Sequence, residues 1–226
     1  MATTAQINYI VSLYAGYFDR APDPAGLQFW IDQIDAGRDT ATIAADFAAS
    51  PEAKALYPFL TVPDVATAST FVTSVYQNLF NRAPDAAGLQ FWTDVIKAGT
   101  VPVGDMIDSI IKGAVDDAAA TPPSFDATVL ANKQAVGLDF ATDAGNTPGF
   151  AYDAAAQAAA TAALNGVTND TATVDAAKAA TDAFLGSAAT GDTTTLTVGV
   201  DALVGTASND TFIAVPVNPT TGAPAT

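Results

Sequence analysis

The chain has 226 residues, half of them hydrophobic, and its eight basic and 24 acidic residues give a net charge of −16. A surface this acidic opposes direct binding to nucleic acid or to an anionic membrane. The chain contains no cysteine and no histidine, which excludes disulfides, the usual structural zinc sites and catalysis by a thiol or an imidazole.

The first predicted element is a helix over residues 3–18. Thr3 and Gln6 fit a capping box at its start, and apolar residues from Ile7 to Phe18 recur at helical spacing. The sequence therefore predicts a helix that packs by one apolar face.

Three more helices are predicted before residue 60. Asp23–Pro24 provides an N-cap and a first helical residue, and Gly37 ends this helix. Thr40 is expected to cap a third helix. Ser50–Pro51 is expected to start a short fourth helix.

A stretch of eleven residues occurs twice. The sequence RAPDPAGLQFW runs from Arg20 to Trp30, and RAPDAAGLQFW runs from Arg82 to Trp92, with ten of eleven residues the same. The residues on either side also correspond, which places the copies near 5–60 and 67–115. We therefore predict two helical hairpins over residues 1–120 that stack and share a core.

Residues 121–190 are rich in alanine, which has the highest helix propensity. The stretches TPP, GNTPG and NGVTND divide this segment into three predicted helices of the same helical domain. Because alanine side chains bury little area, we expect this segment to be less stable than the repeats.

The composition changes at Gly191, after which threonine, valine and glycine predict strands, followed by a linker-like end. The predicted fold class is therefore mainly α, with a multi-helix domain followed by a short β segment in residues 191–226.

The repeated motif has two interpretations. In the structural one, Arg20 and Arg82 pair with the capping aspartates or with helix carbonyls, and the tryptophans fill the core. In the ligand-binding one, arginine, aspartate, glutamine and aromatic side chains together form a surface suited to neutral sugars. The candidate glycan-binding residues are Tyr17, Arg20, Asp23, Gln28, Tyr76, Arg82, Asp85 and Gln90.

The two copies resemble the tandem helical repeat of a domain family of uncharacterised function. The shared pattern is an aromatic residue, Arg-x-Pro-Asp, x-x-Gly-Leu and aromatic-Trp, and it covers roughly residues 5–112. That family occurs in bacterial cell-surface and exported proteins, commonly beside calcium-binding nonapeptide repeats. The pattern is also similar to the helical linker domain of phycobilisomes.

The C-terminal stretch resembles the opening of RTX-type nonapeptide repeats. GVDALVG is followed by NDTF, and Asp201 lies nine residues before Asp210. The resemblance implies that Ca²⁺ binds at Asp201, Asn209 and Asp210, and aspartate oxygens suit this ion. The Gly-Gly-x-Gly start is missing, and the structural alternative is an edge strand with turn-forming Asp and Asn.

Together the two features resemble the N-terminal region of alphaproteobacterial RTX-type surface-layer proteins. This resemblance implies a helical domain that anchors a self-assembling lattice to the O-polysaccharide of lipopolysaccharide, after type I secretion to the cell surface. The N-terminus lacks the pattern of a cleaved signal, and no stretch of about 20 apolar residues predicts a membrane span.

Two other function classes stand beside surface-layer anchoring. One is a self-association or linker module of an exported RTX-type protein or adhesin. The other is an enzyme, which is not expected because triad and metalloprotease chemistry of the common kinds needs histidine. The abundance of aspartate is no evidence for the paired carboxylates of a glycosidase.

Overall fold

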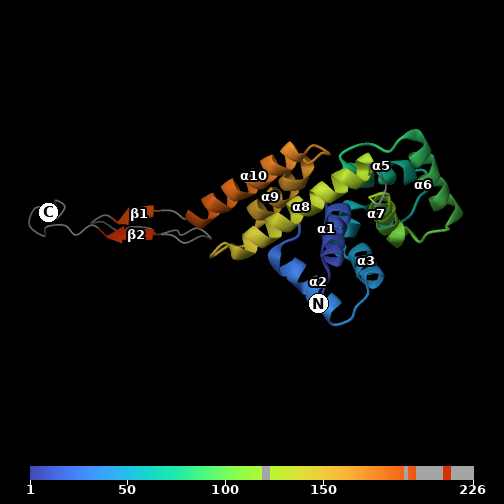
Figure 1. Ribbon diagram of the computed structural model, residues 1–226. Helices are drawn as coiled ribbons and strands as arrows, with labels where there is room; N and C mark the ends of the chain where they lie inside the picture. Colours follow the sequence, from blue (N-terminus) through green and yellow to red (C-terminus); the bar gives the residue numbers. More distant parts are fainter. Residues whose placement is uncertain (119–122, 191–192, 197–210, 215–226) are drawn as a thin grey trace, which may run out of the picture.

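The computed structural model describes residues 1–118, 123–190, 193–196 and 211–214 (Figure 1). These residues are mainly helical, as the sequence predicts. Asp201, Asn209 and Asp210 lie outside the described residues, so the predicted calcium ligands have no structural description here.

The first repeat unit starts at a capping box in which the Thr3 hydroxyl accepts from the Gln6 N–H and the Gln6 side chain accepts from the Thr3 N–H. The capping aspartate of the second helix, Asp23, accepts from the Gly26 N–H at 2.7 Å. The helices of this unit are α1 Thr4–Phe18, α2 Pro24–Asp35, α3 Thr40–Ala49, α4 Pro51–Leu56 and the 3₁₀ turn η1 Pro58–Leu60.

One predicted cap is wrong. Thr40 is the first residue of α3, and the cap is Asp39, whose carboxylate accepts from both the N–H and the hydroxyl of Thr42 at 2.8 Å. The carboxylate uses a separate oxygen for each of these two donors.

The second repeat unit follows the same plan. Its first helix ends at Asn81 in the left-handed conformation (φ 54°), as α1 ends at Asp19 (φ 53°). Asp85 caps the next helix by accepting from the Gly88 N–H at 2.8 Å, and Gly99 ends it. The helices are α5 Ala68–Phe80, α6 Ala86–Ala98, η2 Val103–Asp105 and α7 Met106–Asp117.

The alanine-rich segment forms three helices, divided where the sequence predicts. They are α8 Phe125–Asn146, α9 Ala154–Asn165 and α10 Thr171–Thr190. Figure 1 shows α8 running from the second repeat past α1 to α9 and α10, and it packs against helices of both repeats.

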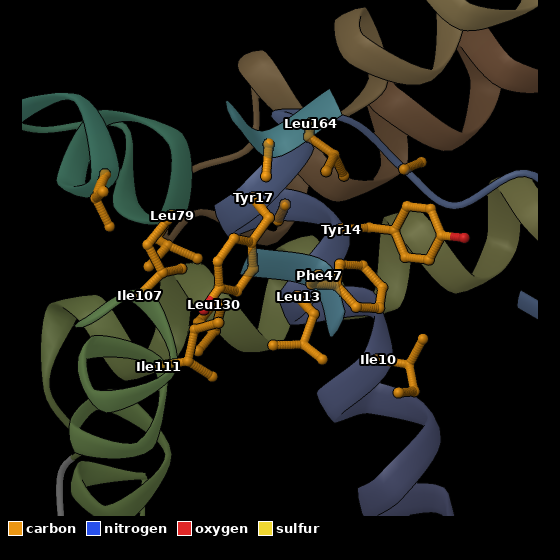
Figure 2. Packing of buried hydrophobic residues seen from close by; sticks show 14 of the residues in the cluster. Ile10, Leu13, Tyr14, Tyr17, Phe47, Leu79, Ile107, Ile111, Leu130 and Leu164 are labelled. Carbon is orange, nitrogen blue, oxygen red and sulfur yellow. The ribbon is translucent and has the colours of Figure 1, made fainter. Parts of the chain in front are cut away.

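The core is built around α1, in which every residue from Ile10 to Tyr17 is buried. Figure 2 shows Leu13 and Tyr17 of α1 in one cluster with Leu79 of α5 and Leu130 of α8. The two repeats and the long helix α8 therefore share a single core.

A glycine sets the closest approach of α1 and α8. A methyl group at Gly137 would lie 2.6 Å from a methyl carbon of Val11, closer than packed carbons tolerate. Large residues of α8, among them Leu130, Val136 and Phe140, are buried in the same core. The lower stability expected of residues 121–190 stays a prediction. The buried residues of α8, however, include large side chains as well as alanines.

Two short strands follow the helices. β1 Thr193–Leu196 and β2 Thr211–Ala214 pair in parallel, with Thr193 opposite Thr211. The other residues of 191–226 lie outside the described residues, so the predicted β region is not established by these two strands.

Candidate functional site

The arginine of each repeat is held in a bidentate ion pair, but not with the partner predicted from the sequence. Arg20 donates to both oxygens of Glu52 at 2.8 and 3.2 Å and also forms the predicted ion pair with Asp23, at the longer distance of 3.6 Å. Arg82 donates to both oxygens of Asp126 at 2.6 Å. Each guanidinium also bonds the next residue's carbonyl.

The two acidic partners occupy equivalent places. Glu52 and Asp126 are each the second residue of a helix that is capped by a serine, Ser50 in one case and Ser124 in the other. The start of α8 therefore completes the second repeat as α4 completes the first, and the repeat unit extends beyond the residue near 115 predicted from the sequence.

The arginines also lie over aromatic rings. The Arg20 guanidinium carbon is 5.0 Å from the ring centre of Tyr14 and 5.3 Å from that of Phe18. Arg82 is 5.4 Å from the ring centre of Tyr76, the residue equivalent to Tyr14. Arg20 is buried, so its charge and both its faces are used within the protein.

The predicted stacking residues have different surroundings. Tyr17 is completely buried, and its hydroxyl donates to the Gly104 carbonyl at 2.8 Å. Tyr76 is half-buried and accepts from the indole N–H of Trp92 at 3.1 Å. Burial raises the pKa of both tyrosines. In this fold Tyr17 is not accessible to a ligand, which corrects its assignment as a stacking residue.

The tryptophans are half-buried rather than central. Trp30 packs against Phe47 with ring centres 5.0 Å apart, whereas Trp92 is held by its hydrogen bond to Tyr76. Asp23 and Asp85 each cap a helix by accepting a backbone hydrogen bond through one carboxylate oxygen. Of the eight predicted glycan-binding residues, Gln28, Gln90 and Asp85 are exposed, and the two glutamines are the exposed ones that hold no helix cap.

An exposed group of three residues surrounds each of these glutamines. We call Gln28, Phe29 and Asp32 patch 1, and Gln90, Phe91 and Asp94 patch 2. In each patch the glutamine donates to the aspartate one turn later at 2.8 Å. The hydrogen bond from Gln90 lowers the pKa of Asp94, and Lys97 nearby lowers it further.

The phenylalanine of each patch is the feature that the sequence analysis missed. Phe29 is 51% exposed and Phe91 is 58% exposed, and each lies edge-on to the tryptophan after it, with ring centres 4.9 Å apart. Helical spacing of about 100° per residue places Phe29 roughly opposite Leu27, away from the buried face. That signal could have identified both aromatics.

The two patches have the same chemistry and lie apart. Each offers an aromatic ring, an amide and a carboxylate; in patch 2 the carboxylate of Asp94 also pairs with Lys97 at 3.5 Å, where the first copy has Asp35. Figure 1 shows α2 and α6, which carry them, on different parts of the repeat pair. The geometry is that of two equivalent contact surfaces rather than one enclosed site.

Two kinds of site are missing from the part of the chain that the structure describes. No helix there is long and apolar enough to span a membrane. No group of three or more acidic side chains there is placed to hold a metal ion.

Comparison with known protein families agrees with the duplication. Residues 1–57 and 63–114 match the family model described as a domain of unknown function (DUF4214). No curated protein and no solved structure matches the chain closely enough to be called similar. The two matched stretches coincide with the two repeat units, and the pair between Arg82 and Asp126 joins the second unit to α8.

Proposed function

We propose that the helical domain is a non-enzymatic anchor that binds the O-polysaccharide of lipopolysaccharide and fixes a surface layer to the cell. The observation that carries the proposal is the duplicated patch. An exposed ring can stack on the apolar face of a sugar, and the amide and carboxylate beside it can bond its hydroxyls.

The structure changes which residues we assign to this contact. Gln28 and Gln90 keep their assigned role, and Phe29 and Phe91 replace Tyr17 and Tyr76 as the stacking residues. Arg20, Asp23, Arg82 and Asp85 support the patches by fixing the turn before each helix.

The charge of the protein limits the kind of sugar. A net charge of −16 disfavours a strongly anionic polysaccharide, so we propose a neutral one, or an anionic one bridged by Ca²⁺. Each contact is small, so strength would come from the two patches and from many copies on one surface.

Calcium belongs to the C-terminal part of the proposal. The register of the parallel pair, Thr193 with Thr211, spans 18 residues, or two periods of nine. This spacing supports an RTX-like region in which Asp201, Asn209 and Asp210 bind Ca²⁺ and the lattice assembles. Type I secretion and a cell-surface location follow from the same proposal.

Cells with and without O-polysaccharide test the anchoring function. The purified protein should bind cells that carry O-polysaccharide and should not bind otherwise identical cells that lack it. Equal binding to both would overturn the proposal.

A second candidate function, self-association, is favoured by the incomplete burial of α6. This helix packs against α5 and has no fully buried residue, whereas its counterpart α2 buries Leu27 and Ile34. On α6, Val95 occupies the position that Gln33 occupies in the first copy. A second copy of the chain could cover the apolar residues left partly exposed.

Sedimentation over a range of concentrations tests self-association. If α6 forms the contact, the wild type should associate reversibly, and Val95→Gln, which places the first copy's residue in the second, should weaken association at least several-fold. A chain that stays monomeric at all concentrations would exclude this function and leave anchoring untouched.

A further inference from the structure

One cavity of the described residues lies away from both patches, in the segment that joins the two repeats. Its volume is about 620 Å³, within the range of roughly 300–1,000 Å³ typical of small-molecule sites. It lies between α4, the η1 turn and α5.

The floor of this cavity is aromatic. The rings of Phe59 and Phe71 are stacked with centres 4.5 Å apart, and Tyr57 lies edge-on to Phe71 at 5.5 Å. Leu56 and Val62 on the wall are large apolar side chains that remain about half and three-quarters exposed. A cavity of this composition favours a ligand with an apolar body.

A single cation lies on the wall of the cavity. Each of the other seven basic side chains forms an ion pair or, for Lys133, hydrogen bonds to Asn78 and Asn81. Lys54 has no ion pair or hydrogen bond in the described part of the chain. Among the described residues Lys54 is thus the basic side chain without an ion pair or hydrogen bond, in a protein whose net charge is −16.

The other polar groups of the wall are mostly hydroxyls. Thr61, Thr70 and Ser74 can each donate a hydrogen bond into the cavity. Asp64 is the acidic residue of the lining, and its carboxylate accepts from the Ala66 N–H at 2.9 Å. The wall therefore offers one ammonium and three hydroxyl donors beside an apolar floor.

We propose that this cavity binds a small amphiphile with one anionic head group, a carboxylate or a phosphate monoester. The head contacts Lys54 and the hydroxyls, and the apolar body lies on Phe59 and Phe71. The site is independent of sugar binding, because it shares no residue with patch 1 or patch 2.

Calorimetric titration of the full chain with decanoate and with decyl phosphate, below their micelle concentrations, tests the proposal. At least one should bind saturably at one per chain, and which of them binds more tightly identifies the head group. Decanol, which has no charge, should bind at least tenfold more weakly. Decanol binding as tightly as both anions would overturn the role of Lys54.

Matched variants separate this site from general charge effects. Lys54→Met should weaken binding of the preferred anion about tenfold, whereas Lys97→Met, which removes the same charge from α6, should leave it unchanged. Thr70→Trp, at an exposed position on the wall, should block the cavity without touching the core. Binding unaffected by both Lys54→Met and Thr70→Trp, or absent in the wild type, would overturn the proposal.

Discussion

The glycine of the repeated motif has different surroundings in the two copies. A methyl group at Gly26 would collide with the Tyr14 hydroxyl and lie 2.7 Å from a carboxylate oxygen of Asp23. At Gly88 the nearest atoms, from Tyr76 and Asp85, would be at an ordinary 3.5 Å. Glycine is therefore required for close packing in the first copy only.

This difference predicts opposite effects of one substitution. Gly26→Ala should lower the free energy of unfolding by about 1–3 kcal/mol, as overpacking does. Gly88→Ala should raise it by about 0.5–1 kcal/mol, because alanine favours the helix over glycine. Urea denaturation of both variants checks this, and equal effects would show that the two copies are packed alike.

At the scale of the elements, α8 connects the two repeats through a buried lysine. Lys133 is fully buried, and its ammonium donates to the Asn78 carbonyl near the end of α5 and to the side chain of Asn81. A cation at a helix C-terminus is favourable. Burial nevertheless lowers the pKa of Lys133 to about 8, which the charge of Asp19 only partly offsets.

The lowered pKa of Lys133 predicts a pH dependence of stability. Above about pH 8 the folded chain releases this proton while the unfolded chain keeps it, so the free energy of unfolding should rise with pH. Lys133 alone should contribute a rise on the order of 2 kcal/mol between pH 8 and pH 10. From about pH 9 the buried tyrosines, whose pKa values are raised, oppose this rise, because the unfolded chain loses their protons while the folded chain keeps them.

Lys133→Met provides the comparison. Denaturation at pH 8, 9 and 10 should show the stability of the wild type, measured relative to the variant, rising on the order of 2 kcal/mol, whatever the stability of the variant at pH 7. Parallel curves for the two proteins would contradict the assignment.

Local signals explain which elements could be predicted from the sequence. A cap depends on residues three apart, so Asp23, Asp85 and the Thr3 box were predictable. The arginine partners were not, because Glu52 lies 32 residues from Arg20, and Asp126 lies 44 residues from Arg82. The unequal spacing also hid the fact that α8 completes the second repeat.

At the scale of the whole molecule, folding buries or pairs most of the residues that the sequence predicts as a sugar-binding surface. The sequence placed eight polar and aromatic residues together as a sugar-binding surface, and the fold uses most of them to hold the turns and the core. What it leaves outside, twice and in the same arrangement, is a phenylalanine beside a glutamine and an aspartate. On the proposed anchoring function, the two patches hold neighbouring parts of a polysaccharide, so losses at the two should multiply.

The most direct test of this account is binding to cells that carry O-polysaccharide, measured for the wild type, Phe29→Ala, Phe91→Ala and the double variant. Each single variant should lose about tenfold in affinity, or about 1.4 kcal/mol, and the double variant more than either. Phe125→Ala removes a similarly exposed ring outside both patches and should bind as the wild type does. A double variant that binds as tightly as the wild type would contradict the account.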